Sequence, residues 1–282
     1  MSMLDSRLHA CRPDLADERL RGRAEAARFS AGRLMQMTAP LTGVYKSPRP
    51  DAMQLTQALM GETVRVFEEE EGWAWAQLEA DGYVGYIPAQ ALSNRLAEPT
   101  HRVVVPATLL YPGPDLKTQP ATAITLNARL RIVGGDGNFA RIADGRFVFA
   151  AHVKTLGGCE TEFVTVAEMF HHVPYYWGGK SVRGLDCSGL VQLSLEAAGR
   201  ACLRDSDMQE ATLGVALDPG DLDKLTRGDL VFWNGHVGIM TNSTTLLHAN
   251  GHHMMVVAEP LREAVARIAR SYGRITAIRR LQ

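Results

Sequence analysis

Cys187 is the residue of this sequence best placed to do covalent chemistry. It follows Asp186 and precedes an apolar run with helical spacing that ends at Gly199, a pattern that predicts a helix with the cysteine in or just before its first turn. The free backbone N–H groups and the positive dipole end of a helix N-terminus favour a thiolate over a thiol. Because a thiolate is a nucleophile, we expect Cys187 to be reactive. The alternative is a buried small side chain, which is the commoner role of an isolated cysteine.

Two histidines on neighbouring strands are the expected partners of this cysteine. Residues 229–250 read as three consecutive strands, with a tight turn at Asn234-Gly235 and a three-residue turn after the second strand. In that register, His236 and His248 lie directly opposite each other on one sheet face. If this face meets the helix, His236 acts as base and ion-pair partner of the thiolate, and His248 orients its imidazole. A zinc site from the same three residues is the alternative, but their spacing is not that of a local ligand set, so neither a metal nor another cofactor is expected.

The composition is that of an ordinary globular protein. The chain has 282 residues, of which 46% are hydrophobic and 22% charged, with a formal net charge of -1. No basic field points to nucleic acid or to an anionic membrane, and no apolar run approaches the length that spans a bilayer, so we expect neither partner. Residues 1–7 contain no apolar core of a secretory signal, so we expect a cytoplasmic location.

The region before the cysteine has the pattern of small β-barrels. Residues 38–158 alternate short β-rich runs with Gly, Pro and Asp turns. Val64-Arg65-Val66-Phe67 recurs as Leu130-Arg131-Ile132-Val133, and an Asp-Gly hairpin signal follows in both copies, at residues 81–82 and 144–145. Two copies of one barrel explain this internal repeat.

We therefore predict four segments. They are an N-terminal helical segment at 1–37 with its helix at Asp14–Phe29, a first barrel at 38–97, a second barrel at 98–158 and a catalytic domain at 159–282. The catalytic segment mixes helices with an antiparallel sheet, so the predicted fold class is α+β.

Short motifs in the C-terminal part occur in an order and spacing that resemble one peptidase family. They are Pro-Tyr-x-Trp-Gly-Gly at 174–179, Asp-Cys-Ser-Gly-Leu at 186–190, Arg-Gly-Asp-Leu-Val-Phe at 227–232, Gly-His-Val-Gly-Ile at 235–239 and His-Ala at 248–249. Together they resemble the NlpC/P60 cysteine peptidases, which have a papain-like core. The first barrel, with Gly-Glu-x-Val-x-Val, Gly-Trp-x-Trp and Asp-Gly-Tyr-x-Gly-Tyr-Ile-Pro between 61 and 88, resembles a bacterial SH3-like (SH3b) domain. The second barrel is a degenerate copy.

The resemblance implies a role for each matched catalytic residue. Cys187 matches the nucleophile, His236 the base and His248 the orienting third residue. Tyr175 matches a tyrosine whose hydroxyl lies beside the nucleophile, where it forms an oxyanion site with the Cys187 backbone N–H. The alternative for Tyr175 is a packed aromatic ring.

Within this family the chain resembles γ-D-glutamyl-L-diamino acid endopeptidases, which cut murein peptides. That resemblance implies a pocket for the free L-Ala amine of the substrate, formed by Asp186, Ser188, Ser206, Glu62 and Tyr83. A buried ammonium needs such acidic and hydroxyl partners. Helix capping is the alternative for Asp186 and Ser188, and a solvated loop acid is the alternative for Glu62.

The predicted function is hydrolysis of the γ-D-glutamyl-L-diamino acid bond of murein peptides with a free N-terminal L-Ala, in cell-wall peptide recycling. The diamino acid is diaminopimelate or lysine. An exported hydrolase that acts on intact wall is the rival enzyme. A non-catalytic SH3b adaptor that binds the wall is the non-enzyme rival, and the complete set of Cys187, His236 and His248 argues against it.

Overall fold

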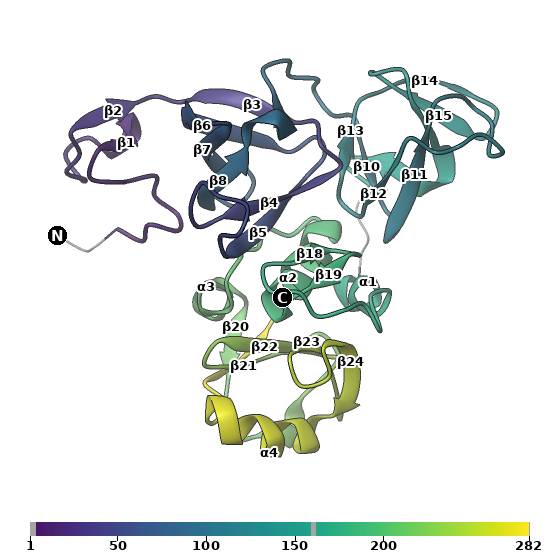
Figure 1. Ribbon diagram of the computed structural model, residues 1–282. Helices are drawn as coiled ribbons and strands as arrows, with labels where there is room; N and C mark the ends of the chain where they lie inside the picture. Colours follow the sequence, from purple (N-terminus) through teal and green to yellow (C-terminus); the bar gives the residue numbers. More distant parts are fainter. Residues whose placement is uncertain (1–3, 159–161, 282) are drawn as a thin grey trace. The chain divides into compact units, whose positions relative to one another are not determined.

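The computed structural model describes residues 4–158 and 162–281, and Figure 1 shows their helices and strands. They form two compact units, the first ending at Gly157 and the second beginning at Gly158. The domain boundary expected after residue 158 adjoins residues 159–161, which lie outside the described part. No helix in the described ranges is long and apolar enough to cross a membrane.

The first unit contains the first barrel. Its strands are β3 (Arg33–Met37), β4 (Leu41–Tyr45), β5 (Gln54–Leu59), β6 (Thr63–Glu70), β7 (Trp73–Leu78), β8 (Val84–Pro88) and β9 (Leu92–Ser93). They form one sheet in the order β5-β4-β8-β7-β6-β3-β9. The Asp-Gly signal lies at the predicted turn between β7 and β8, where Gly82 takes a φ of 77° that suits glycine.

The second barrel repeats the strand order of the first, with two strands, β13 and β14, in place of β6. Its strands are β10 (His101–Val103), β11 (Ala107–Tyr111), β12 (Thr122–Thr125), β13 (Arg129–Leu130), β14 (Ile132–Asp136), β15 (Phe139–Ile142), β16 (Phe147–Phe149) and β17 (Val153–Thr155). They form the sheets β12-β11-β16-β15-β14 and β13-β10-β17. Each barrel has a short 3-10 helix before its last strand, at Ala89–Ala91 and at Ala150–His152. The internal repeat read from the sequence is therefore a repeat of structure.

The helix predicted at Asp14–Phe29 is wrong. The segment forms strand β1 (Leu15–Asp17), a 3-10 turn at Glu18–Leu20 and strand β2 (Arg28–Ser30), and β1 and β2 pair in parallel. Leu15 is fully buried against a cluster from the first barrel, and Gly22 has a φ of 77° that ends any helix there. A short helix is marginal without packing, so tertiary contacts decided the conformation. Strand β3 also precedes residue 38, so the sheet of the first barrel begins earlier than predicted.

The two barrels meet at a turn of the first. Met60 packs into the core of the second barrel, and its carbonyl accepts a hydrogen bond of 2.8 Å from the Arg129 backbone N–H. Gly61 follows with a φ of 81°, and a Cβ added to it would lie 2.0 Å from the Arg129 carbonyl oxygen. Glycine is therefore required here by backbone conformation and by close approach.

Replacing Gly61 by alanine should destabilise the first unit. The left-handed conformation costs about 1–2 kcal/mol for a residue with a Cβ, and the clash with Arg129 adds roughly 1–3 kcal/mol. Gly72→Ala is the matched control, because Gly72 has a φ of 80° and nothing within 4 Å of the added Cβ. Urea unfolding followed by tryptophan fluorescence measures both variants. An equal loss of unfolding free energy in the two variants would contradict the close approach at Gly61.

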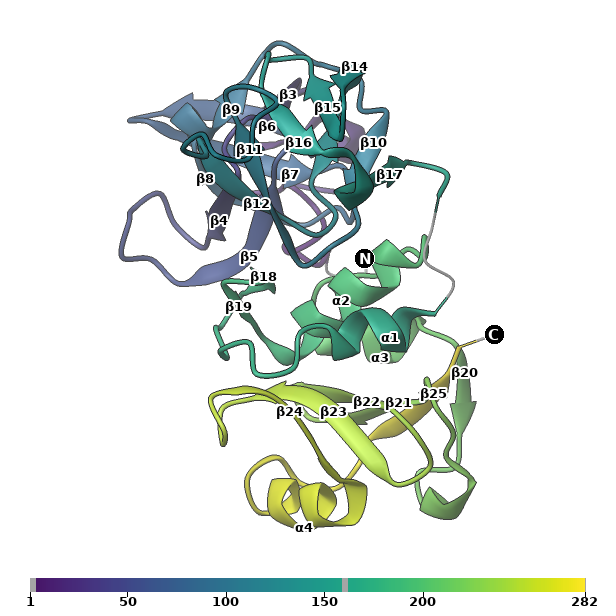
Figure 2. The same ribbon diagram turned by 90° about the vertical axis from the view of Figure 1, so that its right-hand side faces the viewer.

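The second unit is a sheet covered on both faces. Its strands are β18 (Lys180–Ser181), β19 (Gly184–Leu185), β20 (Val215–Leu217), β21 (Leu230–Trp233), β22 (His236–Met240), β23 (Thr245–Asn250), β24 (Met255–Pro260) and β25 (Ala277–Arg280). Its helices are α1 (Phe163–Glu168), α2 (Cys187–Ala197), α3 (Ser206–Thr212) and α4 (Leu261–Tyr272). The main sheet has the order β20-β25-β21-β22-β23-β24. Helices α1, α2 and α3 lie on one side of it and α4 on the other (Figure 2).

Candidate active site

Helix α2 places Cys187 at its first residue, as the sequence predicts. Asp186 is the N-cap residue, and its side chain accepts a hydrogen bond from the Gly189 backbone N–H. The glycines of the flanking motifs let the preceding loop approach this turn, because a Cβ on Gly189 would lie 2.1 Å from the Gly179 carbonyl oxygen. The motif spacing around the cysteine therefore reflects close backbone packing.

The Cys187 sulfur lies beside β22, at the residue that follows His236. The Val237 backbone N–H donates a hydrogen bond to it, and α2 packs against β22 and β23. Burial, aided by the charge of Asp186, raises the pKa of the Cys187 thiol to about 12. Desolvation and the adjacent carboxylate thus oppose the predicted thiolate in the free protein, against the effect of the helix dipole.

His236 and His248 are in direct contact, although their register differs from the predicted one. The last pair before the turn is Met240 with Leu246, so the turn is longer than three residues, and this register sets His248 opposite Gly238 rather than His236. A shift of two residues keeps both side chains on the same face. The two imidazoles meet diagonally, with 2.8 Å between His236 Nε2 and His248 Nδ1.

A carboxylate that the sequence reading missed completes this relay. Glu259 Oε1 lies 2.6 Å from His248 Nε2, and Arg267 of α4 forms an ion pair with the same carboxylate. A carboxylate only accepts, so His248 Nε2 must donate to it, and the Nδ1 of neutral His248 must then accept from His236 Nε2. Nδ1 of His236 is thereby left unprotonated, as a general base requires.

Both imidazoles of the relay are neutral in the free protein. Burial, with a smaller contribution from the charge of His248, lowers the pKa of His236 to about 3. Burial also lowers the pKa of His248, although the Glu259 hydrogen bond opposes this. Burial opposes ionisation of Glu259, but the His248 hydrogen bond and Arg267 lower its pKa. A neutral imidazole is ready to take the thiol proton, and Glu259 stabilises the imidazolium that results.

Tyr175 lies in the same cluster. Burial and the charges of Cys187 and Asp186 raise the pKa of its hydroxyl, and Tyr272 of α4 also contributes. The Tyr272 ring is in turn 6.1 Å from the His236 ring. A tyrosine that keeps its proton remains a hydrogen-bond donor, which suits the predicted oxyanion site.

Asp186 accepts hydrogen bonds from several donors within the second unit. Its Oδ1 accepts from the Gly189 N–H at 2.7 Å and from the Ser188 hydroxyl at 3.4 Å. Its Oδ2 accepts from the Gly178 N–H at 2.7 Å and from Arg204 at 2.6 Å. Helix capping, the alternative stated for Asp186, and an ion pair with the buried Arg204 are the roles seen here, and its contact with the amine stays a prediction.

Ser188 is engaged in the same network. Besides donating to Asp186, its hydroxyl accepts a hydrogen bond of 2.8 Å from Arg204. These bonds use its donor and an acceptor position inside the protein. The network around Asp186 therefore includes Ser188 as well, and its contact with the amine stays a prediction.

The other predicted amine ligands lie in different units. Ser206 is the first residue of α3, and Gln209 of that helix donates a hydrogen bond of 2.9 Å to the Ser188 carbonyl, so α3 is packed beside the first turn of α2. Glu62 and Tyr83 belong to the first barrel, where the Glu62 carboxylate accepts a hydrogen bond of 2.8 Å from the Leu59 N–H. Their roles toward substrate stay predictions.

Family models match two parts of the chain. Residues 172–270 match the NlpC/P60 family, and residues 44–92 match the bacterial dipeptidyl-peptidase Sh3 domain. The chain therefore contains an NlpC/P60 peptidase domain and a bacterial SH3 domain. Among the described residues, no group of His, Cys, Asp or Glu is arranged to hold a metal ion.

Several named proteins are similar over most of the chain. It is 28% identical to the gamma-D-glutamyl-L-lysine dipeptidyl-peptidase of Bacillus cereus over 63% of this chain, and spans only 59% of that relative. It is 25% identical to dipeptidyl-peptidase 6 of Lysinibacillus sphaericus, over 75% of this chain and 86% of the relative. A solved NlpC/P60 family protein from Bacillus cereus has a TM-score of 0.73 at 21% identity, over 88% of this chain and 99% of that one. At this identity the likeness concerns the fold.

The residues missed in this NlpC/P60 site are charged partners of the predicted ones. Glu259 follows an apolar run on the strand beside His248, which is the available sequence signal for it. Arg204 and Arg267 lie 18 and 8 residues from the carboxylates that they pair with. Sequence spacing at these distances does not reveal such pairs, because packing between elements brings them together.

Alkylation of Cys187 in the free protein should be slow at neutral pH and should speed up as pH rises above 9. The pKa raised to about 12 keeps the thiol protonated, and only the thiolate reacts. Iodoacetamide labelling of this site across pH 6–11, quantified by mass spectrometry, measures the profile. Fast labelling that does not change below pH 7 would mean that the thiolate is already formed and would contradict it.

Replacing Glu259 by glutamine should lower kcat by about 10- to 100-fold, the range found for outer partners of functional histidines. The loss of a negative charge also lowers the pKa of both histidines, so the acidic limb of the kcat profile should move to lower pH. Glu263→Gln is the control, because Glu263 is an exposed acid in the first turn of α4. An unmoved acidic limb in the Glu259 variant would show that this carboxylate does not act through the histidines.

Proposed function

We propose that this peptidase hydrolyses the γ-D-glutamyl-L-diamino acid bond of murein peptides that carry a free N-terminal L-Ala. The observation that carries the proposal is the relay of His236, His248 and Glu259 at the strand position beside the Cys187 sulfur. The names of the Bacillus cereus and Bacillus subtilis relatives, gamma-D-glutamyl-L-lysine dipeptidyl-peptidase, support the bond that is cut.

The proposed reaction is acyl transfer through a thioester. Cys187 Sγ attacks the γ-glutamyl carbonyl carbon while its proton passes to His236 Nδ1. The C–N bond then breaks as this proton moves to the leaving amine, and the acyl group remains on sulfur. His236 next takes a proton from water, whose oxygen attacks the thioester, and the proton returns to the sulfur. Tyr175 and the Cys187 backbone N–H donate to the oxyanion in both steps.

Recognition of the free amine is assigned to the start of α3 and to the first barrel. Asp205 precedes Ser206 at the start of α3, and we assign its carboxylate to the ammonium group together with Ser206. Glu62 and Tyr83 remain part of the proposal. Their counterparts in the second repeat are Ala128 and Arg146, which supports a role specific to the first barrel.

A requirement for a free L-Ala amine favours peptide recycling over trimming of intact wall. In intact wall the L-Ala nitrogen is bound in an amide to the glycan, so it carries no charge and cannot form an ion pair. We therefore propose that the substrate is a released peptide and that the enzyme acts on it in the cytoplasm.

The defining experiment compares L-Ala-γ-D-Glu-diaminopimelate and its lysine counterpart with their Nα-acetylated forms and with intact sacculi. We expect cleavage of the free peptides into dipeptide and diamino acid, and at least about 100-fold slower cleavage of acetylated peptide and sacculi, because a buried charged pair is lost. Mass spectrometry of the products measures this. Cys187→Ala is the inactive control.

Matched variants test the amine site. Asp205→Asn should raise KM about 10- to 100-fold with kcat less affected, since one charge-assisted contact is removed. Asp207→Asn, an exposed acid two residues further along α3, should not. Equal cleavage of free and acetylated peptide would refute amine recognition, a preference for sacculi would support the wall hydrolase, and inactivity on all substrates would support the adaptor.

A further inference from the structure

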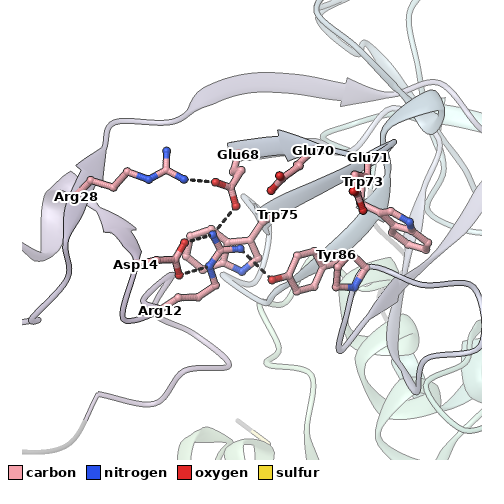
Figure 3. A pocket seen from close by; sticks show the side chains of 10 residues that line it. Arg12, Asp14, Arg28, Glu68, Glu70, Glu71, Trp73, Trp75 and Tyr86 are labelled. Atoms are coloured by element: carbon pink, nitrogen blue, oxygen red, sulfur yellow. Dashed lines mark hydrogen bonds and ion pairs between the residues drawn. The ribbon is translucent and has the colours of Figure 1, made fainter.

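A pocket in the first unit lies where the N-terminal segment meets the first barrel. It has a volume of about 520 Å³ and is lined by Arg12, Asp14, Arg28, Pro48, Glu68, Glu70, Glu71, Trp73, Trp75 and Tyr86. Figure 3 shows Arg12 lying across Trp75 at one end, with Glu70, Glu71 and Trp73 at the other. All these residues belong to the first unit, and none of them is a residue assigned to catalysis or to the free amine.

The inner end of this pocket already holds a cation. The Arg12 guanidinium carbon is 4.3 Å from the centroid of the Trp75 ring. Arg12 also donates to the Tyr86 hydroxyl at 2.9 Å and to Asp14 at 2.7 Å, and it pairs with Glu68. An aromatic face with carboxylates around it is the chemistry that stabilises a guanidinium. The position of Arg12 therefore shows that this surface accommodates a guanidinium group.

The outer end of the pocket also combines an aromatic ring with carboxylates, but no arginine of the pocket lining occupies it. Two arginines against four carboxylates leave the lining with a formal charge of −2, and Glu68 is the carboxylate that pairs with both Arg12 and Arg28. Glu70 and Glu71 are exposed beside the half-buried Trp73 ring. A ring next to two carboxylates again suits a cation with an apolar stem.

Glu71 occupies a turn position that local preference would give to another residue. It forms the two-residue turn between β6 and β7 with Gly72, and its φ is 48°. Asn, Asp or Gly are preferred at such a position. The second barrel folds with Gly134 paired to Arg141 where the first has Glu68 paired to Trp75. The barrel framework therefore does not need this set of side chains.

We propose that the pocket binds an organic cation: an alkylammonium or guanidinium group on an apolar stem, as lysine and arginine side chains carry. The stem lies on the Trp73 ring, and the charged group lies between the carboxylates of Glu70 and Glu71. The bound cation would contact Trp73 and the two carboxylates at the outer end, as Arg12 contacts Trp75 and its carboxylates at the inner end. This site takes cationic ligands whether or not the peptidase is active.

The test is titration of the full chain with Nα-acetyl-lysine methylamide, with pentane-1,5-diamine and with the uncharged Nα-acetyl-norleucine methylamide. The chain has four tryptophans, so their indole N–H signals in NMR report on separate places. We expect the cationic probes to shift the Trp73 signal saturably, with an effect that salt weakens. Binding of the diamine as well would indicate small polyamines as ligands, and binding of the lysine probe alone would indicate a peptide side chain.

Variants make the test specific. Glu70→Gln with Glu71→Asn should weaken binding at least about tenfold, and the asparagine suits the turn, so the fold is kept. Trp73→Phe introduces the residue type that the second repeat has at the equivalent position, Phe139. The indole signal that disappears in this variant is that of Trp73, and the variant should also bind the cationic probes more weakly. Glu69→Gln is the matched control, because Glu69 pairs with Arg33 outside the pocket. Absence of saturable shifts, equal binding of the uncharged probe or unchanged binding in the double variant would overturn the proposal.

Discussion

The carboxylate of Asp186 is the constraint on which the catalytic unit depends. It accepts from the backbone of the loop before α2, from the first turn of α2 and from the buried Arg204. These bonds join three separate pieces of chain at the residue that precedes the nucleophile. A buried carboxylate is costly unless it is hydrogen-bonded, and here both oxygens accept hydrogen bonds. The hydrogen bonds that Asp186 accepts therefore hold Cys187, the next residue, in position.

A second carboxylate organises the other half of the site. Glu259 can only accept, and this single fact sets the proton positions on both histidines and leaves His236 Nδ1 as the base. Arg267 keeps the carboxylate ionised and in place. In the proposed mechanism, the thiol gives up its proton during attack, since burial favours the neutral forms of the thiol and of the imidazole beforehand. Two carboxylates therefore organise the site: Asp186 precedes the nucleophile in the chain, and Glu259 contacts His248.

The two barrels show how one framework can carry different chemistry. Their strands follow the same order, and an aromatic pair recurs, as Tyr45 with Trp73 and as Tyr111 with Phe139. Among the residues that differ between the copies are those at the cation pocket and at the predicted amine contacts. Side chains that the barrel does not need for folding are the ones free to vary, so the comparison between repeats separates scaffold from function.

The local sequence pattern was enough to predict the barrels, the helix that begins at Cys187 and the turn at Asn234-Gly235. These follow from short-range preferences: strand alternation, capping and turn residues with positive φ. The nucleophile and both histidines could be named for the same reason, since each lies at the end or edge of such an element.

Only the tertiary structure decided how these elements meet. The N-terminal segment is extended rather than helical because Leu15 is buried against the first barrel. His248 is diagonal to His236 because the turn is longer than its residues suggest. Asp186 pairs with Arg204, and Glu259 bonds to His248, because packing brings together charged groups that are distant in sequence. The energy of a buried charge depends on what surrounds it in three dimensions, and sequence spacing does not contain that information.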